Sequence, residues 1–183
     1  MSFMYNPFPF DDPRPVNRPE LSEKTVKSII SGGNQNVVKK FVATLADRAA
    51  KEGVVVALDG YTTANWTVFV NLIARECCLQ GLGFEAIDAN AATLKSGKEI
   101  DAIIDPLLIW DTKIDPTLLY GKVYKGGYQA LMDEARTEAF NKAVPASRQA
   151  GKISVVYGYG SLIPELRELY DVKVFFDLTP MKS

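Results

Sequence analysis

Residues 54–80 read VVVALDGYTTANWTVFVNLIARECCLQ, and this stretch decides the fold. It opens with an apolar run, 54–60, in which apolar and polar side chains do not alternate. Such a run is typical of a parallel strand that is covered on both faces. After a loop, residues 66–80 are apolar at nearly every helical position, which predicts a helix buried against the sheet. The stretch is therefore expected to be a buried strand, a loop and a buried helix.

Strands and helices alternate along the rest of the chain. Further strands are predicted at 81–89 (after a turn), 152–158 and 172–177. Helices are predicted at 37–49, 97–104, 128–149 and 161–170. The first of these helices should end at Gly53, and the third should be kinked or broken at Pro145. This alternation predicts a three-layer α/β/α sandwich with a mainly parallel sheet. The last strand is so apolar that we expect it inside the sheet or under cover. The chain is therefore expected to be the first part of a longer protein.

The N-terminal region differs in composition from the rest. Residues 1–20 contain five prolines and three phenylalanines and predict an extended arm. This arm either lays its aromatic side chains on the domain surface or binds a partner. Helices are expected over residues 21–52, the first of them from Ser22 to Ile30. The α/β domain itself is assigned to residues 53–183.

The overall charge and hydropathy exclude several partners. A formal net charge of −1 gives no broad electrostatic footprint for nucleic acid or an anionic membrane. No apolar run approaches the ~20 residues of a membrane-spanning helix, and the N-terminus lacks a secretory signal pattern. We therefore expect a cytoplasmic protein with neither nucleic acid nor membrane as a partner.

The chain contains no histidine, which restricts the chemistry available to it. Ser-His-Asp and Cys-His nucleophile activation are excluded, and so is the usual zinc ligand set. The two cysteines, Cys77 and Cys78, are adjacent, so they do not form a disulfide framework. Both are expected to be buried small side chains, and no resident metal is predicted.

The loop after the first strand has the spacing of a phosphate-binding loop. The P-loop pattern is Gly, four residues, then Gly-Lys-Ser/Thr between a strand and a helix. Here the second glycine is replaced by Asn65 and the lysine by Trp66. Backbone amides at the helix N-terminus could still face an anion, and Thr67 could ligate a nucleotide-bound Mg²⁺. An ordinary strand–helix turn is an equally good reading. The candidate phosphate-binding residues are Gly60, Tyr61, Thr62, Thr63, Ala64, Asn65, Trp66 and Thr67.

Residues 151–180, GKISVVYGYGSLIPELRELYDVKVFFDLTP, resemble a segment of the uridine kinases and their phosphoribulokinase relatives. Leu58-Asp59-Gly60 also stands where that family has Ile-Asp-Gly before its P-loop. The resemblance covers residues 53–180 and implies a P-loop kinase fold. The positions in register with the family pattern are Leu166, Arg167, Glu168, Leu169, Asp171, Lys173 and Asp177.

The same resemblance implies a catalytic base and also weakens the case for catalysis. Asp88 falls where these kinases keep the aspartate that activates the acceptor hydroxyl. The family's Glu-Gly on the third strand is Tyr157-Gly158 here, and the P-loop lysine is absent. The resemblance therefore implies a non-catalytic or weakly active domain that binds a nucleotide or phosphosugar, with Mg-nucleotide as the candidate cofactor. An active small-molecule phosphotransferase is the first alternative.

Residues 118–133, LLYGKVYKGGYQALMD, together with VVYGYG, are similar to the kinase-like N-terminal region of some bacterial class I mannose-6-phosphate isomerases. This resemblance implies a regulatory or scaffold module beside a cupin isomerase domain. A second alternative is a pure interaction domain, either homo-oligomeric or docked on that isomerase.

Five further side chains are candidates for a ligand pocket. They are Asp59, Asp105, Asp111, Tyr157 and Tyr159. Asp105 and Asp111 lie near Trp110 and could line an acceptor pocket, or they could simply cap turns. Trp66 and Tyr61 could stack on a base or sugar, although packing in the core explains Trp66 equally well.

Overall fold

The computed structural model describes residue 23 and residues 33–61, 64–111, 113–117 and 121–176. Within these residues, four strands form one sheet in the order β2-β3-β1-β4, and each neighbouring pair is parallel. The elements in chain order are α2 (Gly33–Glu52), β1 (Val54–Gly60), α3 (Trp66–Leu79), β2 (Gly83–Asp88), α4 (Ala89–Thr93), α5 (Gly97–Ile104), η1 (Asp105–Leu107), η2 (Tyr128–Leu131), α6 (Glu134–Ala146), β3 (Lys152–Tyr157), η3 (Arg167–Leu169) and β4 (Val172–Phe176).

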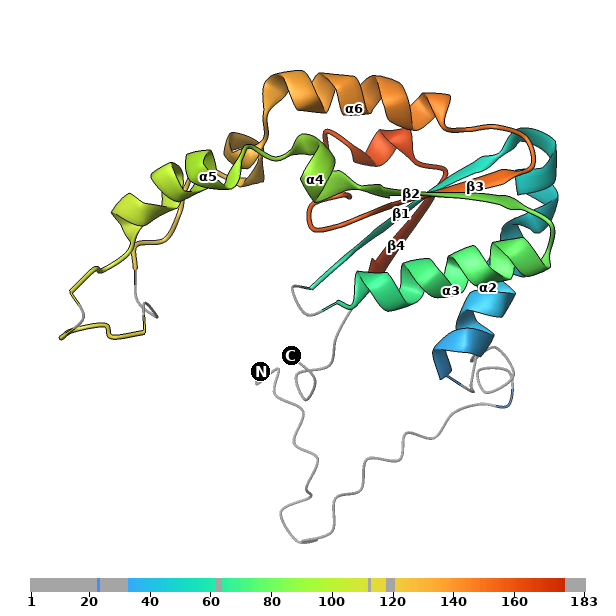
Figure 1. The fold of residues 1–183 in the computed structure, drawn as a ribbon, viewed down its shortest axis with the longest axis horizontal. Helices are drawn as coiled ribbons and strands as arrows, with labels where there is room; N and C mark the ends of the chain where they lie inside the picture. The colour runs from blue at the N-terminus through green and yellow to red at the C-terminus, as the bar shows by residue number, and fades with distance from the viewer. Residues whose placement is uncertain (1–22, 24–32, 62–63, 112, 118–120, 177–183) are drawn as a thin grey trace, which may run out of the picture.

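Helices cover both faces of the sheet, with α6 on one side and α2 and α3 on the other (Figure 1). Strand β1 supplies both cores: Val54, Val56 and Leu58 pack toward α2 and α3, and Val55 and Ala57 pack toward α6. All five are buried, which explains why the strand carries no alternating polar positions. The predicted α/β fold with a parallel sheet between helical layers is confirmed.

Helix α2 has the predicted amphipathic pattern and the predicted end. Val38, Val42, Leu45 and Ala49 are its buried residues, spaced three or four apart. Gly53 follows with φ +78°, and a Cβ at that position would lie 2.3 Å from the carbonyl oxygen of Gln149. Glycine is therefore needed there both for the left-handed turn and for the close approach. The helix expected from Ser22 to Ile30 lies outside the described residues, apart from residue 23.

Helix α3 packs against the sheet as predicted, but it is buried along one stripe only although its sequence is apolar nearly all round. Val70, Ile73 and Cys77 are buried, whereas Val68 is 41% exposed and Leu79 is 71% exposed. The reason is that α3 covers the outside of the sheet and has α2 beside it, so half of its circumference faces solvent. Cys78 is exposed for the same reason, which corrects the expectation that both cysteines are buried.

Strand β4 pairs only with β1 and forms one end of the described sheet, contrary to the expectation that it lies inside the sheet or under cover. Its side chains alternate: Val172, Val174 and Phe176 are half-buried against the core, and Lys173 and Phe175 are exposed. The strand is therefore a one-sided edge strand. Its apolar composition results from a buried inner face plus the exposed Phe175, which packs on Tyr61 with ring centroids 6.0 Å apart.

The helix predicted over 128–149 is two elements. The turn η2 ends at Leu131, and α6 begins at Glu134 because the carboxylate of Asp133 accepts a hydrogen bond from the amide of Arg136 at 2.9 Å. The break therefore occurs at an N-cap. Pro145 lies in the last turn of α6 and does not split the helix.

The helix predicted over 161–170 is mostly a series of tight turns with the short 3₁₀ helix η3. The amide of Ile163 donates to Gly160, and that of Leu166 donates to Ile163, three residues back in each case. Pro164 has no amide to donate, and the amide of Leu162 is bound to Asp59 at 2.9 Å. The backbone amides of this segment therefore do not form the hydrogen bonds of a regular α-helix.

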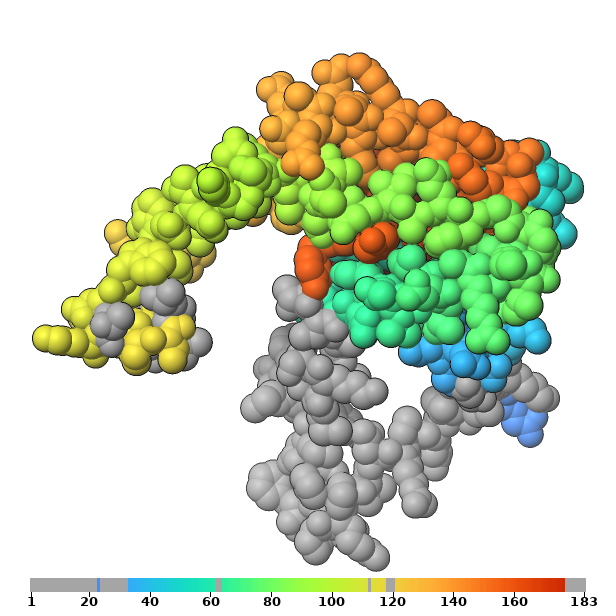
Figure 2. All heavy atoms as spheres, in the orientation of Figure 1, coloured from blue at the N-terminus to red at the C-terminus, as the bar shows by residue number. Residues whose placement is uncertain are grey.

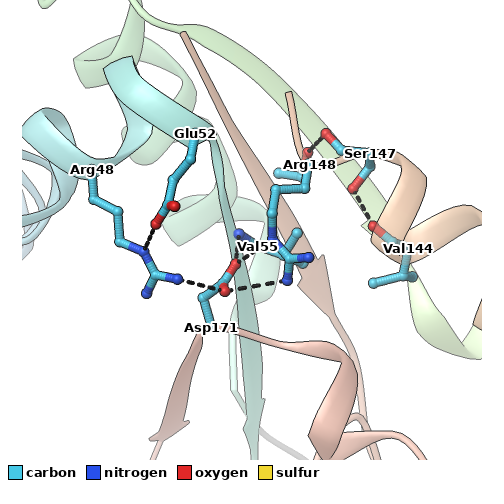
Figure 3. A network of polar contacts seen from close by, with 8 residues as sticks. Arg48, Glu52, Val55, Val144, Ser147, Arg148 and Asp171 are labelled. Atoms are coloured by element: carbon cyan, nitrogen blue, oxygen red, sulfur yellow. Dashed lines mark hydrogen bonds and ion pairs between the residues drawn. The ribbon is translucent and has the colours of Figure 1, made fainter. Parts of the chain in front are cut away.

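A charged cluster joins several elements at the opposite end of the sheet from the loop after β1 (Figure 3). The carboxylate of Asp171, at the start of β4, accepts from the amide of Val55 at 2.8 Å, from Arg48 of α2 at 2.8 Å and from Arg148 after α6 at 3.1 Å. Burial alone would raise the pKa of Asp171, but the Val55 amide and the two arginines outweigh it and hold this pKa below its usual value.

Helix α5 and the described residues that follow it, up to about 127, project from the body of the domain (Figures 1 and 2). The projection is closed by isolated antiparallel bridges between Leu94 and Met132 and between Leu108 and Gly121. It carries exposed apolar side chains, with Trp110 at 58% and Val123 at 83%. No helix among the described residues combines the length and the apolar character that crossing a bilayer requires.

Candidate functional site

The candidate site lies where β1, β2 and β3 end together. Because the three strands are parallel, their carboxyl ends meet at one edge of the sheet, the edge at which α/β folds bind ligands. Asp88 ends β2 and is in register with Tyr157, which ends β3. Asp59 and Gly60 end β1 beside them. The predicted residues Asp59, Asp88, Tyr157 and Tyr159 are therefore brought to one edge.

Asp59 is buried and organises the loop after β3. One carboxylate oxygen accepts from the amides of Gly60 at 2.7 Å and Gly160 at 3.2 Å, and the other accepts from Leu162 at 2.9 Å. Three backbone donors satisfy a carboxylate that is only 8% exposed. Asp59 therefore positions this edge of the sheet, and its oxygens are already occupied by backbone amides.

Asn90 holds the same loop from the other side. Its Oδ1 accepts from the amide of Tyr159 at 3.0 Å, and its Nδ2 donates to the carbonyl of Tyr159 at 2.8 Å and to the hydroxyl of Tyr128 at 2.6 Å. The hydroxyl of Tyr128 in turn donates to the Tyr159 carbonyl at 2.5 Å. The loop following β3 is thereby fixed to the start of α4 and to η2.

The phenols of this edge are held in the neutral state. Burial, followed by the negative charges of Asp59 and Asp88, raises the pKa of Tyr128 to about 12, although its bond with Asn90 acts in the opposite direction. Burial and then the charge of Asp88 also raise the pKa of Tyr157. At neutral pH both hydroxyls are therefore hydrogen-bonding groups rather than anions or bases.

Asp88, the predicted catalytic base, also serves as an N-cap. Its Oδ1 accepts from the amide of Ala91 at 3.0 Å and so begins the short helix α4. The side chain is half-buried at the strand end, beside Tyr157. Asp88 thus stands at the predicted place, with one of its oxygens engaged by the helix.

The loop after β1 uses several of its amides within the protein. The amide of Tyr61 donates to Phe176 of β4 at 3.3 Å, that of Ala64 to Tyr61 at 2.9 Å, and that of Trp66 to Ala64 at 3.1 Å. Asn65 caps α3 by accepting from Val68 at 3.3 Å. Thr62 and Thr63 lie outside the described residues. The donors named here are therefore bonded to the protein and are not presented together to an anion.

Glycine is required at position 60 for a structural reason that is independent of phosphate binding. A Cβ at Gly60 would lie 2.6 Å from the carbonyl oxygen of Phe176 and 2.7 Å from its Cβ. Gly60 and Phe176 are paired residues of β1 and β4, so only glycine allows the two strands to approach there.

Trp66, at the position of the P-loop lysine, is a packing residue. Its ring meets those of Tyr159 and Phe176 edge to face, with centroids 5.9 and 5.3 Å apart. Its Nε1 is buried without a hydrogen-bond partner in the described part of the chain. These ring contacts are what the packing alternative for Trp66 predicts.

Asp105 and Asp111 lie on the projection that follows α5. The carbonyl of Asp105 accepts from Trp110 Nε1 at 2.9 Å, and the carboxylate of Asp111 accepts from the amide of Lys113 at 2.9 Å. The carboxylate of Asp111 therefore caps a turn, as the turn-capping alternative predicted, whereas Asp105 makes its bond through the backbone carbonyl.

A family model described as "Domain of unknown function (DUF8485)" matches residues 37–182, which is most of the chain. The chain belongs to the DUF8485 family. No curated protein matches this DUF8485 chain at a significant level.

Solved structures support the fold of the DUF8485 chain. One match is the "putative fructose transport system kinase" from Silicibacter sp. TM1040, which is 15% identical, with a TM-score of 0.52 over 83% of this chain and 78% of that chain. At this identity the likeness shows the fold alone. The fold is kinase-like, in agreement with the resemblance found in the sequence.

Sequence reasoning missed two members of the site in the DUF8485 chain. Asn90 was not among the predicted site residues, and Tyr128 was predicted only as the start of a helix. Asn90 directly follows a strand end, and this position is the signal that could have identified it. Tyr128 is 38 residues away in sequence, and no local pattern indicates its contact with Asn90. Within the described residues, no group of three or more His, Cys, Asp or Glu side chains could hold a metal ion.

Proposed function

We propose that the DUF8485 domain is a kinase-like binding module that does not transfer phosphoryl groups efficiently. The observation that carries the proposal is the packing of Trp66 between Tyr159 and Phe176 at the lysine position of the P-loop pattern. Phosphoryl transfer depends on positive charge around the transferred group, and an indole supplies none. Amides of the same loop are bonded within the protein, which lowers the attraction for a triphosphate further.

The chemistry of the edge favours a hydroxyl-rich ligand. Asp88 is an acceptor, and Tyr157 and Tyr159 present aromatic rings with hydroxyl groups beside the strand ends. Carboxylate and phenol groups suit the hydroxyls of a sugar ring, and aromatic faces suit its apolar side. We therefore propose the sugar part of a nucleotide or phosphosugar as the bound group, with a regulatory or scaffold role.

Calorimetry tests this function. We expect measurable binding of mannose 6-phosphate, free mannose or uridine that Asp88→Asn weakens about tenfold, while inorganic phosphate alone gives no heat. Asparagine still caps a helix, so this variant retains the start of α4. Binding of phosphate that equals binding of the sugar would contradict the proposed ligand class. An absence of binding heat with every ligand would leave only the scaffold role.

A restored P-loop gives a matched gain-of-function variant. Asn65→Gly together with Trp66→Lys supplies the second glycine and the ammonium group that the pattern requires. We expect Mg-ATP binding to appear in this variant and to be absent from the natural chain, with circular dichroism as the check on folding. ADP release by the natural chain that Asp88→Asn abolishes would instead establish the phosphotransferase alternative, with Asp88 as base and Thr67 on Mg²⁺.

The association with a mannose-6-phosphate isomerase is a separate proposal that rests on the resemblance of residues 118–133 alone. It is tested by mixing the chain with a cupin-type class I isomerase and measuring co-elution and isomerase rate. An unchanged rate together with independent elution would remove the association and leave the binding function untouched.

A further inference from the structure

An apolar groove of about 390 Å³ lies between α2, α3 and the edge strand β4, outside the candidate site. Its walls are largely aliphatic and aromatic: Val37, Phe41, Phe69, Val174, Phe175 and Phe176. Phe175 is 58% exposed and Val37 is 37% exposed. Removing apolar surface from water is favourable in proportion to its area, so the groove favours an apolar occupant.

The walls also indicate the kind of occupant. Four phenylalanines line a groove beside a sheet edge, and strand β4 is paired on only one side within the described sheet. Grooves with aromatic walls bind proline-rich segments in the extended polyproline conformation, because such segments lose little conformational entropy on binding.

The chain itself contains a segment of that chemistry. Residues 1–20 read MSFMYNPFPFDDPRPVNRPE, with five prolines and the aromatic residues Phe3, Tyr5, Phe8 and Phe10. A segment so rich in proline cannot form a helix, and its aromatic side chains need an apolar surface to cover them.

The groove is within reach of this segment. Asn34, in the first turn of α2, lines the groove, so the chain enters α2 at the groove itself. Residues 21–32 separate the segment from α2 and can span up to ~40 Å when extended. A tethered ligand of this kind has an effective concentration in the millimolar range, so even weak contacts are formed.

We propose that the groove between α2, α3 and β4 binds residues 1–20 of the same chain, with Phe8 and Phe10 in the pocket. The proline-rich segment is thereby an internal ligand of the domain, and its release would open an apolar surface beside β4.

The test uses the full-length chain. In the double variant Phe8→Ser/Phe10→Ser, we expect several-fold greater binding of an apolar dye and faster hydrogen exchange in α2, α3 and β4. We also expect a labelled peptide of residues 1–20 to bind this variant but not the natural chain, whose groove is occupied. Unchanged dye binding and exchange would overturn the proposal, and so would equal binding of the peptide to both proteins.

Groove variants locate the contact. Phe175→Glu puts a charge into the pocket at an exposed position, and should weaken binding of the peptide to the double variant at least about tenfold. Leu79→Glu is the matched control, since Leu79 is 71% exposed on α3 and does not line the groove. Equal effects of the two substitutions would overturn the location. A concentration-dependent dimer that requires Phe8 and Phe10 would overturn docking within one chain in favour of exchange between copies.

Discussion

The side-chain amide of Asn90 binds the backbone of Tyr159 at both of its polar groups. Oδ1 accepts from the Tyr159 amide at 3.0 Å, and Nδ2 donates to the Tyr159 carbonyl at 2.8 Å. After the end of β3, Asn90 therefore provides the acceptor and the donor that a neighbouring strand would provide within the sheet. The candidate site depends on this pairing, because it fixes the backbone of Tyr159, two residues after Tyr157.

Replacing Asn90 by alanine should therefore lower the free energy of unfolding. We expect a loss of about 1–3 kcal/mol in urea denaturation, because the amide and the carbonyl of Tyr159 each lose their hydrogen bond to Asn90, although the hydroxyl of Tyr128 still donates to the carbonyl. Asn71→Ala is the control: Asn71 is exposed on α3, where alanine is the better helix former. A loss for Asn90→Ala no larger than the change for Asn71→Ala would show that the pairing contributes nothing.

Gly160 and Gly81 form a matched pair for measuring close packing. Their φ angles are +74° and +70°, but a Cβ at Gly160 would lie 2.6 Å from the ring of Tyr128, whereas nothing lies within 4 Å of one at Gly81. Alanine should cost about 1–2 kcal/mol at either position, because of the left-handed backbone. At Gly160 we expect about 1–3 kcal/mol more, because the Tyr128 ring must move.

Thermal and urea unfolding of the two alanine variants measure the difference. The Gly160→Ala variant should also let Tyr128 titrate below its pKa of about 12, because moving the ring exposes the phenol and burial is the main cause of the raised pKa. Equal costs at both glycines would mean that the loop after β3 adjusts freely and does not hold the site in place.

The strands and their succession along the chain could be predicted, because the sequence signals for them are local. An apolar run such as 54–60 indicates a strand that is buried on both faces, and Gly53 indicates where α2 ends. Where the predictions failed, long-range contacts decided the outcome. The amide of Leu162 is bound by Asp59, 103 residues away, which helps to prevent a helix at 161–170.

The candidate site was predictable only in part, for the same reason. Asp88 became a candidate because it lies at the end of a predicted strand, and Asp59 and Tyr157 because they stand at motif positions of the kinase resemblance. Tyr128 was not found, because it reaches the edge from η2 and contacts Asn90, which lies 38 residues earlier in the chain. Asp105 and Asp111 were included on residue type alone, and their contacts stay within the projection that follows α5.

Because of Asp171, the free energy of unfolding of the domain should depend on pH in the acid range. Its pKa is held below the ordinary value in the folded state, so its contribution to stability is present above the unfolded pKa of about 3.8 and disappears as pH falls through the folded pKa. Asp171→Asn should cost about 1–3 kcal/mol at neutral pH, because the charge-assisted bonds to Arg48 and Arg148 are lost while an acceptor for Val55 remains.

Urea denaturation of the natural chain and of Asp171→Asn between neutral pH and acid checks this dependence. The difference in unfolding free energy should be largest near neutrality and should shrink below about pH 4. The exposed pair of Lys142 and Glu138 supplies the control, since Glu138→Gln should change the stability by less than about 0.5 kcal/mol. A difference for Asp171→Asn that stayed constant with pH would contradict the assigned ionisation.

The neighbouring cysteines should differ sharply in reactivity. Cys77 is fully buried, and burial followed by the charge of Glu76 raises the pKa of its thiol to about 11, whereas Cys78 is exposed on the other side of α3. Only the thiolate reacts, so near pH 8 we expect one thiol per chain to react with Ellman's reagent, and the second on the order of 100-fold more slowly. Cys78→Ser should abolish the fast reaction, and Cys77→Ser should leave it unchanged. Two thiols reacting at one rate in the native protein would mean that α3 does not press a single face against the sheet.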